Sequence, residues 1–157
     1  MHIPDIEIIA GELSKIDVIR PLWEDLLAYN SALHRGCYGY LLHKSWNEKK
    51  EEFKKRSEEG FVKFDVVKVH DSIVGYCIST MSKALEGEIV SLYVLQNFRR
   101  KGIGTRLVSD HLHWLKENNA KHIYLYVHPC NIDAIPFHWT FGFFSNSPLM
   151  ELCAREE

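Results

Sequence analysis

Apolar residues recur with two different periods along this chain, and the period separates predicted strands from predicted helices. Runs rich in β-branched residues predict strands over 6–10, 61–69, 73–80, 88–95 and 121–127. Apolar residues at helical spacing predict helices over 13–27, over 44–59 and from the turn at 99–105 to Lys116. Pro21 falls inside the first helical stripe and is expected to kink that helix or split it in two.

The order of these elements predicts the type of sheet. The strands over 61–69 and 73–80 are separated only by His70-Asp71-Ser72, a tight turn of the hairpin type, and a loop is expected over 81–87. Hairpin strands followed by a strand, a helix and another strand indicate an α/β protein with a mixed sheet and helices on its faces. The 157 residues fit one domain, expected to span 1–157.

The turn between the strand over 88–95 and the next helix has the chemistry of a phosphate site. It reads Arg99-Arg100-Lys101-Gly102-Ile103-Gly104-Thr105. A helix N-terminus offers an anion unpaired backbone N–H groups and a favourable dipole, and Gly102 and Gly104 let the backbone approach a ligand closely. We therefore expect nucleotide phosphate here. The alternative is an ordinary helix start with glycines in a turn and basic residues in water.

The spacing of this turn excludes two common phosphate motifs. The Rossmann fingerprint needs a third glycine where this chain has Leu107. A P-loop needs Gly-Lys-Ser/Thr where this chain has Gly104-Thr105-Arg106. What remains, Arg99-x-x-Gly102-x-Gly104, resembles the coenzyme A pyrophosphate loop of the GNAT superfamily of N-acyltransferases.

A second run of residues strengthens this resemblance. Asn131-x-x-Ala134, then Phe137, then Phe141-Gly142-Phe143 is similar to the family's second signature, a short helix and a Gly-Phe turn into a last strand. The two signatures stand in the family's order and together span about 87–144. The chain is thereby identified as a member of the GNAT superfamily.

The resemblance implies the GNAT fold, a mixed sheet of about six to seven strands in the order strand, two helices, three strands, helix, strand, helix, strand. It implies that the fourth and fifth strands, over 88–95 and 121–127, run parallel and splay apart to admit the pantetheine arm of coenzyme A. Edge groups of Leu92, Tyr93 and Val94 are then candidates for contacting the arm and the acyl carbonyl, with an N–H near Val94 stabilising the oxyanion.

Two side chains are candidates for moving protons. A lysine-like amine has a pKa near 10.4, so holding it neutral at pH 7 costs roughly 4–5 kcal/mol and a base assists. Glu88 stands where family members that use a glutamate base carry it. Asp65, Tyr126 and His128 are alternative bases. The non-catalytic alternative is that Glu88 only begins a strand at the surface. Many relatives have a tyrosine proton donor seven residues after the signature Asn, where this chain has His138. Histidine can donate a proton near neutral pH, so His138 is either the acid or a packed helix residue.

The remaining candidates bind the coenzyme or the acceptor. The turn is assigned to the pyrophosphate and the 3′-phosphate through Arg99, Arg100, Lys101, Gly102, Ile103, Gly104 and Thr105. Asn131 is expected to contact the pantetheine arm or to cap the helix that follows it. Tyr38, in a loop between the first helices, and Tyr126 are candidate contacts to the acceptor.

Composition limits the expected partners and compartment. The net charge of −2 provides no basic field for nucleic acid, and no apolar run approaches the ~20 residues that span a bilayer. Without a basic-then-apolar N-terminus, the expected location is the cytoplasm. The four cysteines form no C-x-x-C pair, and the rings of His111-x-His113 point apart on a helix, so free thiols and no metal are expected.

The sequence therefore predicts an N-acetyltransferase that moves an acetyl group from acetyl-CoA directly to a primary amine of a small molecule or peptide. Nucleic acid and membrane are not expected partners, whereas a homodimer is a candidate because dimers are frequent in the family. Two other classes stay open. His138 at the tyrosine position favours a non-catalytic acyl-CoA-binding or sensing module, and Leu107 disfavours a dinucleotide-binding protein.

Overall fold

The computed structural model describes residues 5–33, 44–128 and 131–146 of the chain. Its first elements are β1 (Ile6–Ala10), the 3-10 helix η1 (Leu13–Ile19), α1 (Arg20–Leu33) and α2 (Trp46–Glu59). They are followed by β2 (Gly60–Val69), β3 (Ser72–Ser82), β4 (Glu86–Val94) and the 3-10 turn η2 (Gln96–Phe98). The last described elements are α3 (Ile103–Glu117), β5 (His122–Tyr124) and α4 (Ala134–Trp139).

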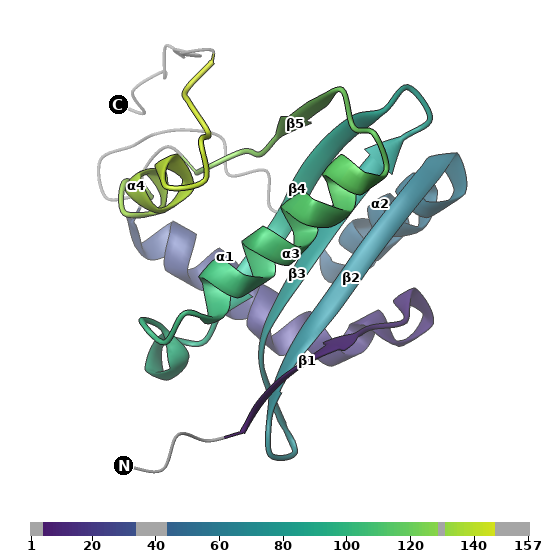
Figure 1. The fold of residues 1–157 in the computed structure, drawn as a ribbon. Coiled ribbons are helices and arrows are strands. Elements are labelled where there is room, and N and C mark those ends of the chain that lie inside the picture. The colour runs from purple at the N-terminus through teal and green to yellow at the C-terminus, as the bar shows by residue number, and fades with distance from the viewer. Residues whose placement is uncertain (1–4, 34–43, 129–130, 147–157) are drawn as a thin grey trace, which may run out of the picture.

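The strands form one sheet in chain order, from β1 at one edge to β5 at the other (Figure 1). Neighbours from β1 to β4 are antiparallel, whereas β5 runs parallel to β4. The β4–β5 ladder is short, because only Glu86–Glu88 pairs with His122–Tyr124. Beyond this ladder the chain leaves β4 and leads to α4 (Figure 1). The predicted splay between the fourth and fifth strands is confirmed.

Helices cover both faces of the sheet, and each face has its own apolar core. Figure 1 shows α3 in front of the sheet and α1 and α2 behind it. The core behind the sheet contains residues of η1, α1 and α2, among them Ile19, Trp23 and Phe53. The core in front contains residues of α3, among them Leu107, Val108 and Leu115, and Phe137 of α4 packs against it. Successive residues of a strand point to opposite faces, and the central strands β2, β3 and β4 contribute to both cores.

Local sequence signals explain where two helices begin. Pro21 is the second residue of α1, and the segment before it is a separate 3-10 helix, so the predicted split at Pro21 is confirmed. Proline is tolerated there because the first turn of a helix has no partner for its N–H groups. Ser45 caps α2: its hydroxyl accepts the N–H of Glu48, and the Glu48 carboxylate accepts the N–H of Ser45.

The structure differs from the sequence-based prediction in four places. Helix α1 continues to Leu33, beyond the expected end at residue 27. The loop expected over 81–87 shrinks to 83–85, because Met81 still pairs with Gly87 and the β3–β4 hairpin continues. The strand expected over 121–127 ends at Tyr124, where its partner is lost. No strand follows Gly142 up to residue 146, so the described part has five strands rather than six to seven. Residues 147–157 lie outside it.

Candidate functional site

Strand β4 is irregular where β5 turns away. Its register against β3 jumps between Ile78 and Ser79, which leaves Val90 as an extra residue in a β-bulge. The bulge follows Glu88, the last residue of β4 that pairs with β5. From there to Val94, one edge of β4 has no strand beside it in the described part of the chain. Backbone groups on this edge are available to a ligand.

One hydrogen bond fixes which groups face the free edge. Leu95 donates its N–H to the carbonyl of Val74 in β3, at 2.8 Å. N–H groups alternate in direction along a strand, so Val94 and Leu92 direct theirs away from β3. Tyr93 directs its backbone toward β3, and its side chain belongs to the core behind the sheet. The geometry leaves Leu92 and Val94 as the edge contacts and turns the Tyr93 backbone away.

The basic glycine turn forms the start of α3. Gly102 is the N-cap residue with φ +79°, and Arg100 also has a left-handed φ of +62°. Turns of this kind bring successive N–H groups together in a concave anion site. Arg106 donates its N–H to the Gly102 carbonyl at 3.0 Å, which is the first intrahelical bond. The N–H groups over 103–105 precede that bond and have no intrahelical partner, so this turn fits a phosphate group.

The basic side chains of the turn have different environments. The Arg99 guanidinium lies over the rings of Tyr29 and Tyr93, at 5.1 and 5.2 Å from their centroids. Its Nε donates to the Val94 carbonyl at 2.8 Å. Arg99 therefore ties the turn to α1 and β4, although the sequence assigned it to phosphate. The exposed charges at the turn are those of Arg100 and Lys101.

Glu88 is a buried carboxylate at the point where β4 and β5 part. It is 5% exposed, and Nη1 of Arg56 in α2 donates to its Oε2 at 2.5 Å. The same nitrogen donates to Oγ1 of Thr80 at 3.2 Å, and Nη2 lies 3.2 Å from Oε1 of Glu52. Burial lowers the pKa of Arg56, but the hydrogen bond and charge of Glu88, with the charge of Glu52, outweigh it and raise the pKa overall. The guanidinium is thus held between two carboxylates.

Two tyrosines lie on the β5 side of Glu88. Tyr124 is the register partner of Glu88, and its ring meets that of Tyr126 edge-on with centroids 5.9 Å apart. Burial and the charge of Glu88 raise the pKa of Tyr124, so its hydroxyl stays protonated at neutral pH. Tyr126 is 85% exposed. The candidate acceptor contact Tyr126 therefore stands beside Tyr124, whereas Tyr38 lies outside the described residues.

Helix α4 places His138 among aromatic rings. The imidazole meets Phe137 and Phe143 edge-on, and its Nδ1 is buried without a hydrogen-bond partner in the described part of the chain. Burial lowers the pKa of His138, so the ring is neutral at pH 7. A neutral ring can form a hydrogen bond, but it does not carry the extra proton of a general acid.

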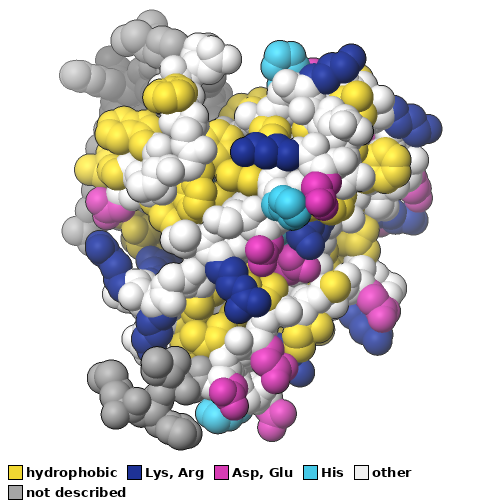
Figure 2. Space-filling view, in the orientation of Figure 1, with side chains coloured by type: hydrophobic (Ala, Val, Ile, Leu, Met, Phe, Trp, Pro, Cys, Tyr) yellow, Lys and Arg dark blue, Asp and Glu magenta, His cyan; other side chains and the backbone are white. Residues whose placement is uncertain are grey.

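The segment between β5 and α4 contains Asn131. The N-cap residue of α4 is Asp133, two positions later, so the expectation that Asn131 caps this helix is wrong. The Asn131 carbonyl instead accepts the N–H of Ala134 at 3.2 Å, in a turn before the helix. Hydrophobic side chains gather on the surface over α4 (Figure 2), where Ile132 and Trp139 are exposed.

The alternative base Asp65 belongs to a separate network on the α3 face. Its carboxylate accepts a hydrogen bond from Nε2 of His111 at 3.1 Å and lies 3.1 Å from Nζ of Lys63. Nδ1 of His111 lies 2.7 Å from Oγ of Ser79. Burial raises the pKa of Asp65, but the His111 and Lys63 contacts outweigh it and lower the pKa overall. Asp65 lies on β2, two strands away from β4, where the splay begins. It therefore cannot take part in a reaction at the splay.

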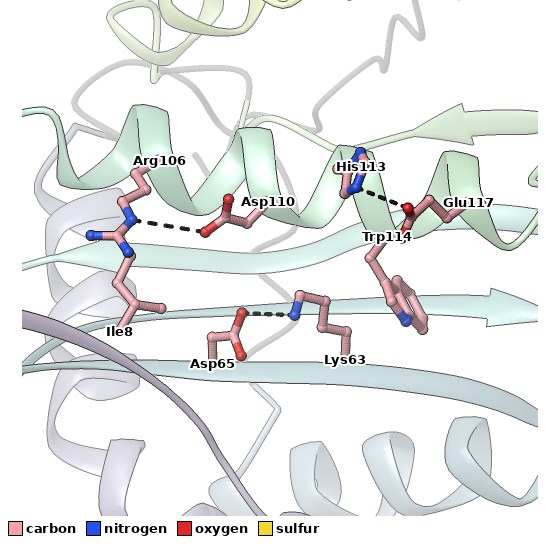
Figure 3. A pocket seen from close by; sticks show the side chains of 8 residues that line it. All are labelled: Ile8, Lys63, Asp65, Arg106, Asp110, His113, Trp114 and Glu117. Carbon is pink, nitrogen blue, oxygen red and sulfur yellow. Dashed lines mark ion pairs between the residues drawn. The ribbon is translucent and has the colours of Figure 1, made fainter.

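A groove of about 370 Å³ lies beside this network. Figure 3 shows Asp65 and Lys63 on β2 facing a row of charged side chains on α3. Arg106 lies 4.0 Å from Asp110, and His113 lies 3.0 Å from Glu117. The charges of the groove are therefore paired with one another. His113 points outward and His111 inward, as expected for residues two apart on a helix.

Sequence reasoning missed Arg56. The residue belongs to a charged run with balanced signs, which is typical of a solvated helix face. Helical spacing is the signal that could find it, because Arg56 follows the buried Phe53 by three positions and shares that side of α2. Nothing in a single sequence pairs it with Glu88, 32 residues further on.

Within residues 5–33, 44–128 and 131–146, no helix is long and apolar enough to cross a membrane. The same residues contain no group of three or more His, Cys, Asp or Glu side chains that could hold a metal ion. Cys77 is a buried free thiol, and the other cysteines lie outside these ranges.

A splayed mixed sheet, with a free strand edge leading to the open start of a helix, matches the architecture that the two sequence signatures imply. Residues 22–143 match the Acetyltransferase (GNAT) family. The chain belongs to this family, and the resemblance carried by the signatures is confirmed.

Individual relatives agree with this membership. An N-alpha-acetyltransferase of Sulfolobus acidocaldarius is 33% identical over a match that covers 51% of this chain and 55% of the relative. The chain thus spans about half the length of the relatives it matches in this way.

Solved structures agree with the fold. The PaiA N-acetyltransferase of Thermoplasma acidophilum, in complex with coenzyme A, has a TM-score of 0.70 at 19% identity and covers 90% of this chain and 91% of its own. The aminoglycoside N-acetyltransferase AAC(6')-Iy, in complex with CoA, has a TM-score of 0.69 at 11% identity and covers 98% of this chain and 97% of its own.

Proposed function

We propose that this protein transfers an acetyl group from acetyl-CoA to a primary amine of a small molecule or a peptide. The free edge of β4, which leads to the open start of α3, is the observation that carries the proposal. The edge offers N–H and C=O groups to an amide-containing arm, and the helix start offers N–H groups to phosphates. The names of the relatives, an N-alpha-acetyltransferase and an aminoglycoside N-acetyltransferase, support an amine acceptor, and the CoA complexes support a CoA donor.

The residues of the site fit coenzyme A. The N–H groups over 103–105 and the exposed charges of Arg100 and Lys101 would hold the phosphates. The outward backbone groups of Leu92 would pair with the amides of the arm, and the Val94 carbonyl, which accepts from Arg99, leaves the Val94 N–H for the acyl group. When bound, the thioester supplies the acyl carbon that the amine attacks and the thiolate that leaves. The Val94 N–H is the donor for the negative charge that develops on the acyl oxygen.

We place the acceptor amine on the α2 side of the splay. On the α3 side, a Cβ at Gly104 would already contact Phe137 of α4, at 3.4 Å, so this helix limits access. On the α2 side, Tyr124 and Tyr126 are exposed beside Glu88. Glu88 accepts the proton that the ammonium group of the acceptor must lose, directly or through water, before the nitrogen attacks.

His138 remains a hypothesis for the proton donor to the leaving thiolate. Its motif position supports this role, whereas its neutral, apolar setting supports packing. If His138 is the donor, His138→Phe lowers turnover at least about tenfold with little change in affinity for acetyl-CoA. Unchanged turnover in a steady-state assay would remove His138 from the mechanism.

A thiol-release assay tests the proposed function. Acetyl-CoA is mixed with the protein and a panel of polyamines, amino acids, aminoglycosides and peptides with free N-termini. Release of free CoA above the amine-free background for at least one acceptor class is the expected result. Calorimetry with acetyl-CoA runs in parallel, with NAD as a control. Heat without turnover would indicate a non-catalytic acyl-CoA-binding module, and no heat at millimolar acetyl-CoA would contradict the proposal.

A further inference from the structure

Helix α2 supplies the counter-charge of a buried carboxylate that the proposed reaction uses. Glu88 is almost completely shielded from water, and an isolated buried carboxylate costs several kcal/mol. Arg56 meets it at 2.5 Å, and the same guanidinium nitrogen also reaches Thr80 in β3. Three elements therefore converge on one charge at the place where β4 and β5 separate.

Arg56 is itself held by a second carboxylate. Glu52, one helical turn earlier, lies 3.2 Å from Nη2 of Arg56. Glu52 is in turn 2.9 Å from Nζ of Lys44 and 3.3 Å from Nζ of Lys49. The helix is anchored by the fully buried Phe53 and by its capping box. A planar guanidinium with acceptors on two sides has little freedom to rotate, so it also fixes the carboxylate that it meets.

We propose that Arg56 is the positioning residue for the base of the acetyl transfer, holding the Glu88 carboxylate in one orientation at the β4–β5 divergence. This inference rests on the proposed function. The groups that face Glu88 are Arg56 from α2, Thr80 from β3 and Tyr124 from β5, with Glu52 behind Arg56. Because Tyr124 stays protonated, Arg56 is the one charged partner of Glu88 among the described residues.

Rate and pH profile together test this role. We compare wild type, Arg56→Gln and Arg56→Lys by kcat/KM between pH 5 and pH 9, using acetyl-CoA and the best amine of the panel. Arg56→Gln is expected to lower kcat/KM about tenfold or more at pH 7, with KM for acetyl-CoA unchanged. The acid limb of its pH profile should differ from that of wild type, because the substitution removes the charge beside Glu88. Arg56→Lys keeps the charge and should restore the limb and part of the rate.

Lys55→Gln is the matched control. It removes the same charge from the same helix one residue away, where Lys55 is 72% exposed and lies 3.8 Å from Glu59. We expect a wild-type rate and pH profile from this variant, since exposed pairs contribute little. Equal changes in Lys55→Gln and Arg56→Gln would overturn the proposal, because they would reflect the net charge of α2.

Two further outcomes decide the proposal. A wild-type rate and acid limb in Arg56→Gln would overturn it. If Arg56→Gln does not fold, the double variant Arg56→Gln/Glu88→Gln removes both charges together and is compared with Glu88→Gln. Equal rates support a residue that acts through Glu88, and a further loss of rate overturns this role. Failure of the proposed function looks different, because the wild type itself then releases no thiol with any amine.

Discussion

Two buried networks occupy opposite faces of the same sheet. On the α2 face, Glu88 pairs with Arg56; on the α3 face, Asp65 pairs with His111, which reaches Ser79. Both carboxylates are 5% exposed, and both receive their partner from a helix. The two carboxylates differ in how the strands around them are paired. Glu88 stands where a strand ladder ends, whereas Asp65 lies within strands paired on both sides.

This difference separates a structural network from a candidate catalytic one. Asp65 can only accept, so Nε2 of His111 donates to it, and Nδ1 of the same ring forms a hydrogen bond with the Ser79 hydroxyl. Ser, His and Asp are the residue types of a hydrolytic triad, but Ser79 and His111 are fully buried and cannot meet a substrate. This hydrogen-bonded network fixes α3 to the sheet. A buried acid becomes a candidate for catalysis only where the fold opens beside it, as at Glu88.

The largest expected effect is on the rate of Glu88→Gln. Removal of a general base lowers kcat/KM by about 10²-fold or more. Affinity for acetyl-CoA should stay unchanged, because the proposed phosphate site lies at the start of α3, on other residues. Steady-state kinetics and calorimetry on the same preparation measure both quantities. A variant within a factor of two of wild type would show that Glu88, like Asp65, is structural.

The complementary substitution is His111→Ala on the other face. Removing His111 leaves the buried Asp65 carboxylate and the buried Ser79 hydroxyl each without one hydrogen-bond partner. Each such loss costs about 1–3 kcal/mol, so the free energy of unfolding should fall by about 2–6 kcal/mol. Turnover per folded molecule should be retained. Urea denaturation measures the loss, and His113→Ala is the control, because His113 lies on the exposed side of the same helix. Wild-type stability in His111→Ala would contradict the structural assignment of this network.

Much of the fold could be predicted from periodicity, and its errors concern strand ends. The pattern over 121–127 has the residues of a strand throughout, yet only His122–Tyr124 pairs. A strand exists where a partner supplies hydrogen bonds, and the splay removes that partner after Tyr124. The loop expected over 81–87 is wrong for the converse reason, because the pairing of Met81 with Gly87 extends both strands through polar residues.

The candidate functional site likewise has one part that the sequence predicts and one part that it does not. Its backbone part follows from spacing, since glycines between a strand and a helix place N–H groups at a helix start wherever the rest of the chain lies. Its side-chain part depends on partners far away in the sequence. Arg99, a phosphate candidate by its position in the turn, contacts the rings of Tyr29 and Tyr93. Arg56 stands in a charged run typical of a solvated helix face, yet it meets Glu88. Such contacts leave no periodic signal in one sequence.

The smallest expected effects come from Ser79 and Thr80, neighbours on β3 that point to opposite faces. Ser79 meets His111 and Thr80 meets Arg56, at 2.7 and 3.2 Å. Ser79→Ala leaves a buried imidazole nitrogen without its hydrogen-bond partner and should cost about 1–3 kcal/mol of unfolding free energy, with kcat/KM unchanged. Thr80→Val keeps the shape of the side chain and loosens Arg56, so it should lower kcat/KM a few-fold and leave the acid limb in place, because the charge beside Glu88 is retained.

These two substitutions compare the α2 face with the α3 face most directly. Ser79 and Thr80 are neighbours on one strand, their burial is similar, and each substitution removes one hydroxyl. If the two faces differ in role, the substitution at Ser79 lowers the stability and the substitution at Thr80 lowers the rate. A rate loss in Ser79→Ala, at wild-type stability, would mean that the α3 face acts on the reaction through the position of α3 and the N–H groups at its start. The two faces of the sheet would then not separate a structural network from a catalytic one.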